Sequence, residues 1–144
     1  MKTILAPIDF SPASDAVVAQ ATALAHAVQG RLVLLSVVQP PLITSDYGPL
    51  IDNIADIISA AERSATERLE KVRQQALSAV AVVETEMAGG PPVQAITDAA
   101  ARFSADFIVM GSHGHTALYD LVIGSTTHGV LKRAKCPVVI IPAA

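Results

Sequence analysis

The residues best suited to chemistry lie in a glycine-containing stretch, 111–127, that follows the run 106–110, which is typical of a buried strand. Gly111 and Gly114 have no side chain that could obstruct a ligand, and both can adopt positive φ. Gly124 comes directly before three hydroxyl residues, at the start of a segment with helical character. Because the main-chain N–H groups at a helix start bind anions, the stretch predicts a phosphate site held largely by main chain.

Other phosphate and metal motifs fit the sequence poorly. Residues 124–129 have the glycine spacing of a P-loop, but Val130 and Leu131 stand where Lys and Ser or Thr are needed. No Gly-x-Gly-x-x-Gly is present, which argues against a Rossmann dinucleotide site. His113 and His115 have no acidic or thiol partner at ligand spacing, so we expect no metal site.

Strand-like runs alternate with helical patterns along the chain. Strands are expected at residues 3–9, 31–38, 80–86, 106–110 and 136–141, and helices at 12–28, 50–76, 93–103 and 125–133. Ser11 is expected to cap the first helix, with Pro12 at its first position and Gly30 ending it. The alternation predicts an open, doubly wound α/β fold with a parallel sheet, in a single domain spanning 1–144.

Ligands of such sheets bind beyond the carboxyl ends of the strands, where the strand order reverses. Asp9 and Gly111 both lie at such ends. They flank one crevice if the strand order is 3-2-1-4-5. The order 2-1-3-4-5 would place the crevice beside residues 87–89, which offer no matching chemistry. Asp9 could instead serve only as a turn or capping carboxylate.

The helix expected at 50–76 is amphipathic. Its apolar residues recur at helical spacing, whereas its other face carries a run of charges that we expect to be solvated. These charged residues are Glu62, Arg63, Glu67, Arg68, Glu70, Lys71 and Arg73.

Composition narrows the class of protein. Apolar residues make up 51% of the chain and aromatic residues only 3%, so we expect a core of Val, Ile, Leu and Ala. A net charge of −3 without a basic cluster argues against nucleic acid or an anionic membrane as the partner. The first residues do not resemble a signal peptide, and no apolar run is long enough to span a membrane. With Cys136 as the single cysteine, a reducing cytoplasm is the expected location.

The spacing Gly-x-x-Gly, nine residues, then Gly-Ser resembles the nucleotide-binding signature of the universal stress protein family, in its ATP-binding branch. Segments 7–11, 37–40, 90–96 and 136–140 resemble the family's other strand ends and loops, so the resemblance covers nearly the whole chain. It implies a Rossmann-like, adenine nucleotide alpha hydrolase-like sheet of order 3-2-1-4-5. The nucleotide-binding residues that it implies are Pro7, Asp9, Val38, Gly111, Ser112, His113, Gly114, Gly124, Ser125, Thr126 and Thr127.

The resemblance also implies a function. It describes a regulatory protein that binds ATP, with or without Mg²⁺, and is coupled to the stress response through a protein partner or its oligomeric state. A slow ATPase or nucleotidyl transferase and a module that binds no nucleotide remain alternatives. The apolar last strand, Pro137 to Ile141, is expected at a sheet edge, where a second copy could cover it. A homodimer through this strand is therefore expected.

Overall fold

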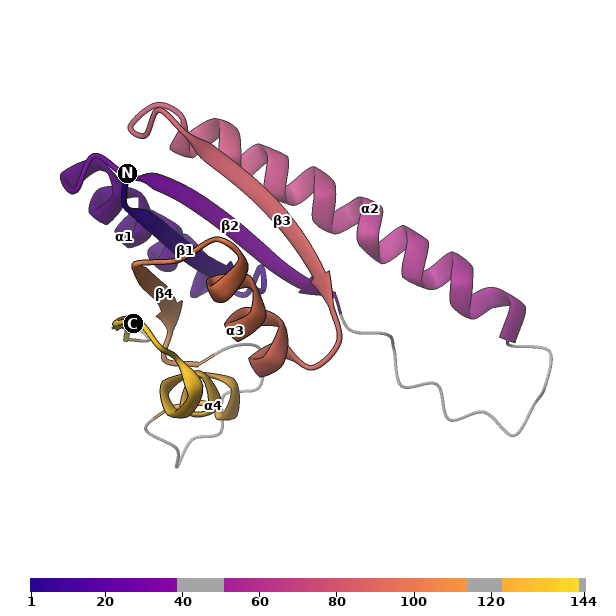
Figure 1. Ribbon diagram of the computed structural model, residues 1–144. Helices are drawn as coiled ribbons and strands as arrows, with labels where there is room; N and C mark the ends of the chain where they lie inside the picture. The colour runs from indigo at the N-terminus through magenta and orange to yellow at the C-terminus, as the bar shows by residue number, and fades with distance from the viewer. Residues whose placement is uncertain (39–50, 114–122, 143–144) are drawn as a thin grey trace.

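The computed structural model describes residues 1–38, 51–113 and 123–142. Five parallel strands form one sheet in the order β3-β2-β1-β4-β5, which confirms the expected topology (Figure 1). The strands are β1 (Thr3–Ile8), β2 (Arg31–Val38), β3 (Val83–Gly89), β4 (Phe107–Gly111) and β5 (Val138–Ile141). The helices are α1 (Ser14–Ala27), α2 (Ile51–Ala76), α3 (Pro92–Arg102) and α4 (Ser125–Arg133).

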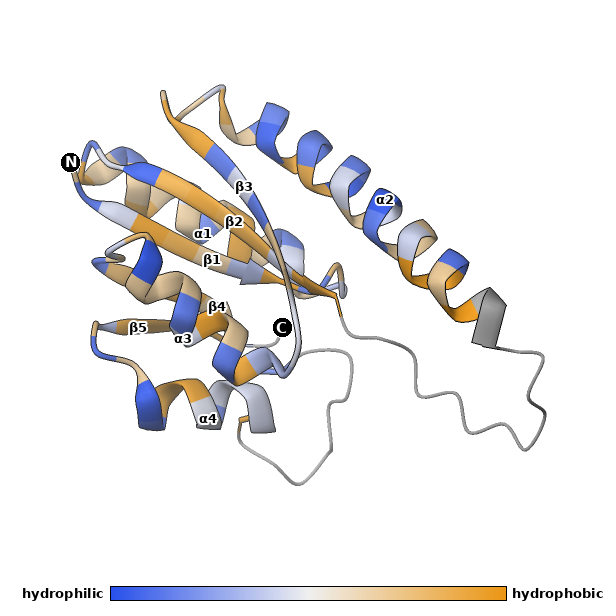
Figure 2. Ribbon diagram, turned by 45° about the vertical axis from the view of Figure 1, so that its right-hand side comes forward, coloured by the Kyte–Doolittle hydropathy of each residue, from blue (hydrophilic) through white to orange (hydrophobic). Residues whose placement is uncertain are grey.

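The sheet is covered on both faces, with α1 and α2 on one side and α3 and α4 on the other (Figures 1 and 2). Successive residues of a strand point to opposite faces. Ile4 of β1 accordingly packs with Val17 and Leu69 of the first pair of helices, whereas Leu5 packs with Ile96 of α3. This double burial explains why the central strands are continuous apolar runs.

Several element boundaries differ from the sequence-based expectation, and two of these differences have a local cause. β3 begins at Val83, because the apolar Val80 belongs to the turn after α2, where its N–H donates to the Ala76 carbonyl at 3.0 Å. α1 begins at Ser14, and no side chain caps it. The prediction that Ser11 caps this helix is wrong: its main-chain carbonyl accepts a hydrogen bond from the Ser14 N–H at 2.9 Å instead.

Gly30 is needed after α1 because no side chain fits there, and not because of its backbone conformation. The left-handed residue there is Gln29, with φ 52°. A Cβ at position 30 would overlap with the carbonyl oxygen of Lys2, which lies at the start of the neighbouring strand. The glycine therefore lets the turn after α1 pass close to β1, before β2 begins.

A polar cluster fixes the amino ends of the central strands, opposite the candidate site. The Thr3 N–H donates to the Asp106 carboxylate at 2.8 Å, and this bond lowers the pKa of that carboxyl. Arg31 donates through Nε to the Thr3 hydroxyl at 2.7 Å and through a terminal nitrogen to the Phe103 carbonyl at 3.0 Å. These bonds tie β1, β2 and the turn before β4 together, which supports the register that aligns their carboxyl ends.

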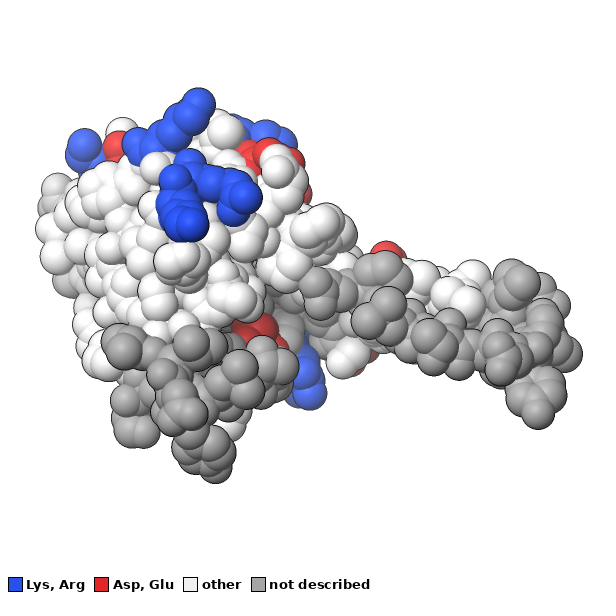
Figure 3. All heavy atoms as spheres, turned by 90° about the horizontal axis from the view of Figure 1, so that it is seen from below, with Lys and Arg blue, Asp and Glu red and all other residues white. Residues whose placement is uncertain are grey.

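The outer face of α2 is polar and its inner face apolar, as expected (Figure 2). α2 also continues beyond the sheet at its N-terminal end (Figure 1). Seen from below, Lys and Arg gather mostly towards one edge of the described surface, the rest of which is largely uncharged (Figure 3). Within the described residues, no helix combines the length and the apolar character that a membrane span requires.

We expect Gly30→Ala to destabilise the fold by about 1–3 kcal/mol, because neither backbone segment can move away cheaply. Gly89→Ala is the matched control, since its Cβ would lie 3.8 Å from the Val38 carbonyl oxygen, an ordinary contact. The control should change the free energy of unfolding by less than about 0.5 kcal/mol. Urea denaturation measures both, and equal stability of the two variants would contradict the close approach.

Candidate functional site

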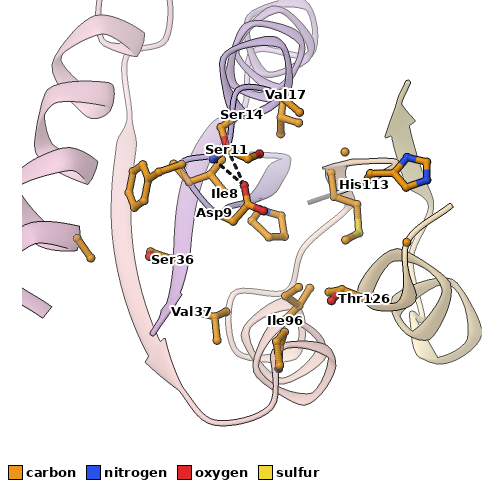
Figure 4. A pocket seen from close by; sticks show the side chains of 18 of the residues that line it. Ile8, Asp9, Ser11, Ser14, Val17, Ser36, Val37, Ile96, His113 and Thr126 are labelled. Atoms are coloured by element: carbon orange, nitrogen blue, oxygen red, sulfur yellow. Dashed lines mark hydrogen bonds between the residues drawn. The ribbon is translucent and has the colours of Figure 1, made fainter. Parts of the chain in front are cut away.

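A pocket of about 540 Å³ lies at the carboxyl edge of the sheet (Figure 4). Its wall is built from the ends of β1, β2 and β4, the starts of α1, α3 and α4, and the middle of α2. β1 and β4 are neighbours, yet the chain leaves them towards opposite faces of the sheet. The pocket is thus the crevice expected where the strand order reverses.

The Asp9 side chain organises the turn between β1 and α1. Its Oδ1 accepts hydrogen bonds from the Ser11 N–H at 3.0 Å and from the Ser14 hydroxyl at 3.1 Å (dashed lines in Figure 4). Phe10, inside this turn, has φ 59°, an uncommon conformation for a bulky residue that the flanking bonds hold in place. Asp9 is therefore a turn carboxylate and also part of the pocket wall.

The start of α4 is joined to the end of β4 by two hydrogen bonds. The Gly124 N–H donates to the Ser112 carbonyl at 2.7 Å, and the buried Thr127 hydroxyl donates to the Gly111 carbonyl at 2.7 Å. No side chain caps the helix among the described residues. Its first main-chain N–H groups have no acceptor within the helix, so this end of the pocket favours an anion.

Gly111 does not have the positive φ that the sequence suggested. Gly124 is extended, with φ −73°, and of the described glycines only Gly90 has positive φ. At Gly111 the constraint is space, since a Cβ would lie 3.2 Å from the His113 carbonyl oxygen. At Gly124 a Cβ would meet nothing nearer than 3.5 Å, so the protein itself tolerates a side chain there.

Most of the predicted site residues line one pocket. They are Pro7, Asp9, Val38, Gly111, His113, Gly124, Ser125, Thr126 and Thr127. Ser112 does not: its side chain is buried, with Oγ 3.1 Å from His113 Nδ1. Gly114 lies outside the described residues. Because the Thr127 hydroxyl donates to Gly111, Thr127 can donate to a ligand only through its N–H.

Sequence reasoning missed the wall that α2 contributes. Ala61, Ser64, Ala65 and Arg68 line the pocket, and their spacing of i, i+3, i+4 and i+7 places them on one helix face. Arg68 is exposed, as expected for one of the solvated charges, and its guanidinium also lies over the Phe10 ring at the pocket. Three small residues followed by a cation at this spacing were the signal that could have identified the face.

The described part of the pocket wall carries few charged side chains. Asp9 and Arg68 are the charged residues, and His113 the histidine, among the described residues that line it. Within the described ranges, no three His, Cys, Asp or Glu side chains gather as metal ligands. Cys136 lies outside the pocket wall, and burial raises the pKa of its thiol, which disfavours the nucleophilic thiolate.

Solved structures share this architecture. A universal stress protein from Lactobacillus plantarum is 28% identical with a TM-score of 0.86, and the match covers 97% of each chain. A universal stress protein in complex with cAMP is 22% identical, with a TM-score of 0.75, over 99% of this chain and 98% of that one. The Archaeoglobus fulgidus protein in complex with dAMP is also 22% identical, with a TM-score of 0.68, over 98% of this chain and 97% of that one.

Sequence comparison leads to the same family. A universal stress protein of Thermus aquaticus is 34% identical over 143 residues, which cover 97% of this chain and 98% of that protein. The model of the universal stress protein family matches residues 1–142. The strand order is consistent with both matches, and the chain belongs to the universal stress protein family.

Proposed function

We propose that this chain binds ATP, with or without Mg²⁺, as a cytoplasmic regulatory domain of residues 1–144. The observation that carries the proposal is the continuity of one pocket from the uncapped start of α4 to the ends of β1 and β2. Its volume of about 540 Å³ lies within the range of small-molecule sites, roughly 300–1,000 Å³. Solved universal stress proteins in complex with cAMP and dAMP support an adenine nucleotide as the class of ligand.

The pocket suggests one orientation for the nucleotide. The phosphates lie at the start of α4, where the N–H groups of residues 125–127 can donate to them. The ribose then lies near Asp9, and the edge of the base meets the main chain of Val38 at the end of β2. Bound ATP contacts both α2 and α4 in this orientation. A protein partner or a second copy can therefore recognise a surface that depends on the ligand.

We expect Gly124→Val to abolish ATP binding while the sheet stays intact. A φ of −73° suits valine, and the nearest atom to a Cβ is the Ser112 carbonyl oxygen at 3.5 Å, so the fold has room. The branched side chain would instead obstruct the approach of the phosphates to α4. Calorimetric titration with ATP and circular dichroism on the same preparation provide the test.

Two controls make that titration decisive. Gly89→Ala, outside the pocket wall, should bind ATP as the wild type does. In the wild type, ATP at about a hundredfold excess over Kd should stabilise the fold by about 2.7 kcal/mol through mass action. Normal ATP binding by the valine variant would refute the anion site at α4, and no rise in melting temperature of the wild type with millimolar ATP would refute the function.

We propose that the chain forms a homodimer through its last strand, Pro137 to Ile141. β5 is an edge strand beside β4. The carbonyls of Pro137 and Ile141 accept hydrogen bonds from the β4 side at 3.0 and 2.9 Å. Because successive residues alternate in direction, Val138 and Ile140 turn their main-chain groups outward. A second copy related by a two-fold axis could pair with these groups and cover the edge.

We expect Ile140→Pro to convert this dimer to a monomer, because it removes an outward N–H without removing a bond to β4. Ile140→Ala keeps the N–H and serves as the control, which should remain dimeric. Light scattering at several concentrations reports the mass, and circular dichroism reports whether the sheet survives. A dimeric proline variant would place the interface elsewhere, and a monomeric wild type would rule out the homodimer.

A further inference from the structure

One basic side chain of α2 belongs to the pocket wall. The guanidinium carbon of Arg68 lies over the Phe10 ring, 5.2 Å from its centroid. Both residues line the pocket, and Arg68 is the only lysine or arginine among the described residues that do so. The ring and the guanidinium over it together form a cationic part of the wall.

Arg68 lies at the end of the pocket away from α4. α2 packs over β2 and β3, whereas α4 packs beside α3 on the other face of the sheet (Figure 1). Ala61, Ser64 and Ala65 share the helix face of Arg68 and have small side chains, which leave room beside the guanidinium. A nucleotide whose phosphates lie at α4 therefore extends its base towards this wall.

We infer that Arg68 is a base-recognition residue, with its guanidinium held between the Phe10 ring and the nucleobase. The inference rests on the proposed nucleotide site and adds the residue that selects the base. A guanidinium is planar and weakly hydrated, and it stacks on aromatic faces, which a lysine ammonium cannot do as a flat group. Purines offer a larger face to this contact than pyrimidines, so the wall favours ATP over CTP.

Calorimetric titration of the wild type, Arg68→Gln and Arg68→Lys with ATP, CTP and inorganic tripolyphosphate tests this inference. Arg68→Gln should weaken ATP binding roughly two- to thirtyfold, the range expected for a cation–π contact. It should reduce the preference for ATP over CTP and leave tripolyphosphate binding unchanged. Arg68→Lys keeps the positive charge but replaces the planar guanidinium with an ammonium group, so ATP binding should stay weakened.

Arg63→Gln is the matched control, because it removes one positive charge from an exposed position of α2 outside the pocket wall. It should leave binding of all three ligands unchanged. Equal weakening of tripolyphosphate and ATP by Arg68→Gln would overturn the inference, as would unchanged ATP binding or full recovery in Arg68→Lys. If the wild type binds no ATP, the proposed function fails and this inference fails with it. If the wild type and Arg68→Gln bind ATP equally well, only the role of Arg68 is refuted.

Discussion

The attachment of α4 to the end of β4 is the constraint on which the site depends. Two short hydrogen bonds, from Gly124 to the Ser112 carbonyl and from Thr127 to the Gly111 carbonyl, determine where the helix begins. They bring uncapped main-chain N–H groups to the carboxyl edge of the sheet, where an anion is favoured. The hydroxyl of Thr127 is structural in this arrangement, and the helix presents its first main-chain N–H groups at the pocket.

The strand order then supplies the rest of the pocket. Because β1 lies between β2 and β4, the Asp9 turn lies beside the start of α4 and beside the end of β2. The polar cluster of Thr3, Arg31 and Asp106 fixes the opposite ends of the same strands. α2 adds a wall of small residues and one cation, so the pocket is bounded from both faces of the sheet. The pocket thus depends on three strands and four helices held together by one sheet.

Much of the fold could be predicted from the sequence because its physical signals are local. Continuous apolar runs identified the buried strands, and alternation with helical patterns identified the parallel sheet. The start of β3 was missed because the apolar Val80 does not belong to the strand. It is buried in the core from the turn after α2. Ser11 was taken as a helix cap because its residue type and the following proline fit one, whereas the Asp9 carboxylate organises that turn.

The candidate site could be predicted in part. Asp9, Gly111 and Gly124 were expected together because each follows a strand or precedes a helix, and all three line the pocket. Arg68 was missed because a run of charges on one helix does not reveal which of them faces a distant turn. The reason for Gly111 also lay in the tertiary structure, since close approach to the His113 carbonyl, and not positive φ, explains it.

The most direct test of the central claim is the response of main-chain amides to ATP, measured by nuclear magnetic resonance. If main chain at the start of α4 holds the phosphates, the N–H signals of Ser125, Thr126 and Thr127 should shift on addition of ATP. Inorganic tripolyphosphate should shift the same three signals, while the N–H of Val38 should respond to ATP alone. Saturating ATP that leaves the α4 amides unmoved, or shifts confined to other surfaces, would contradict the account.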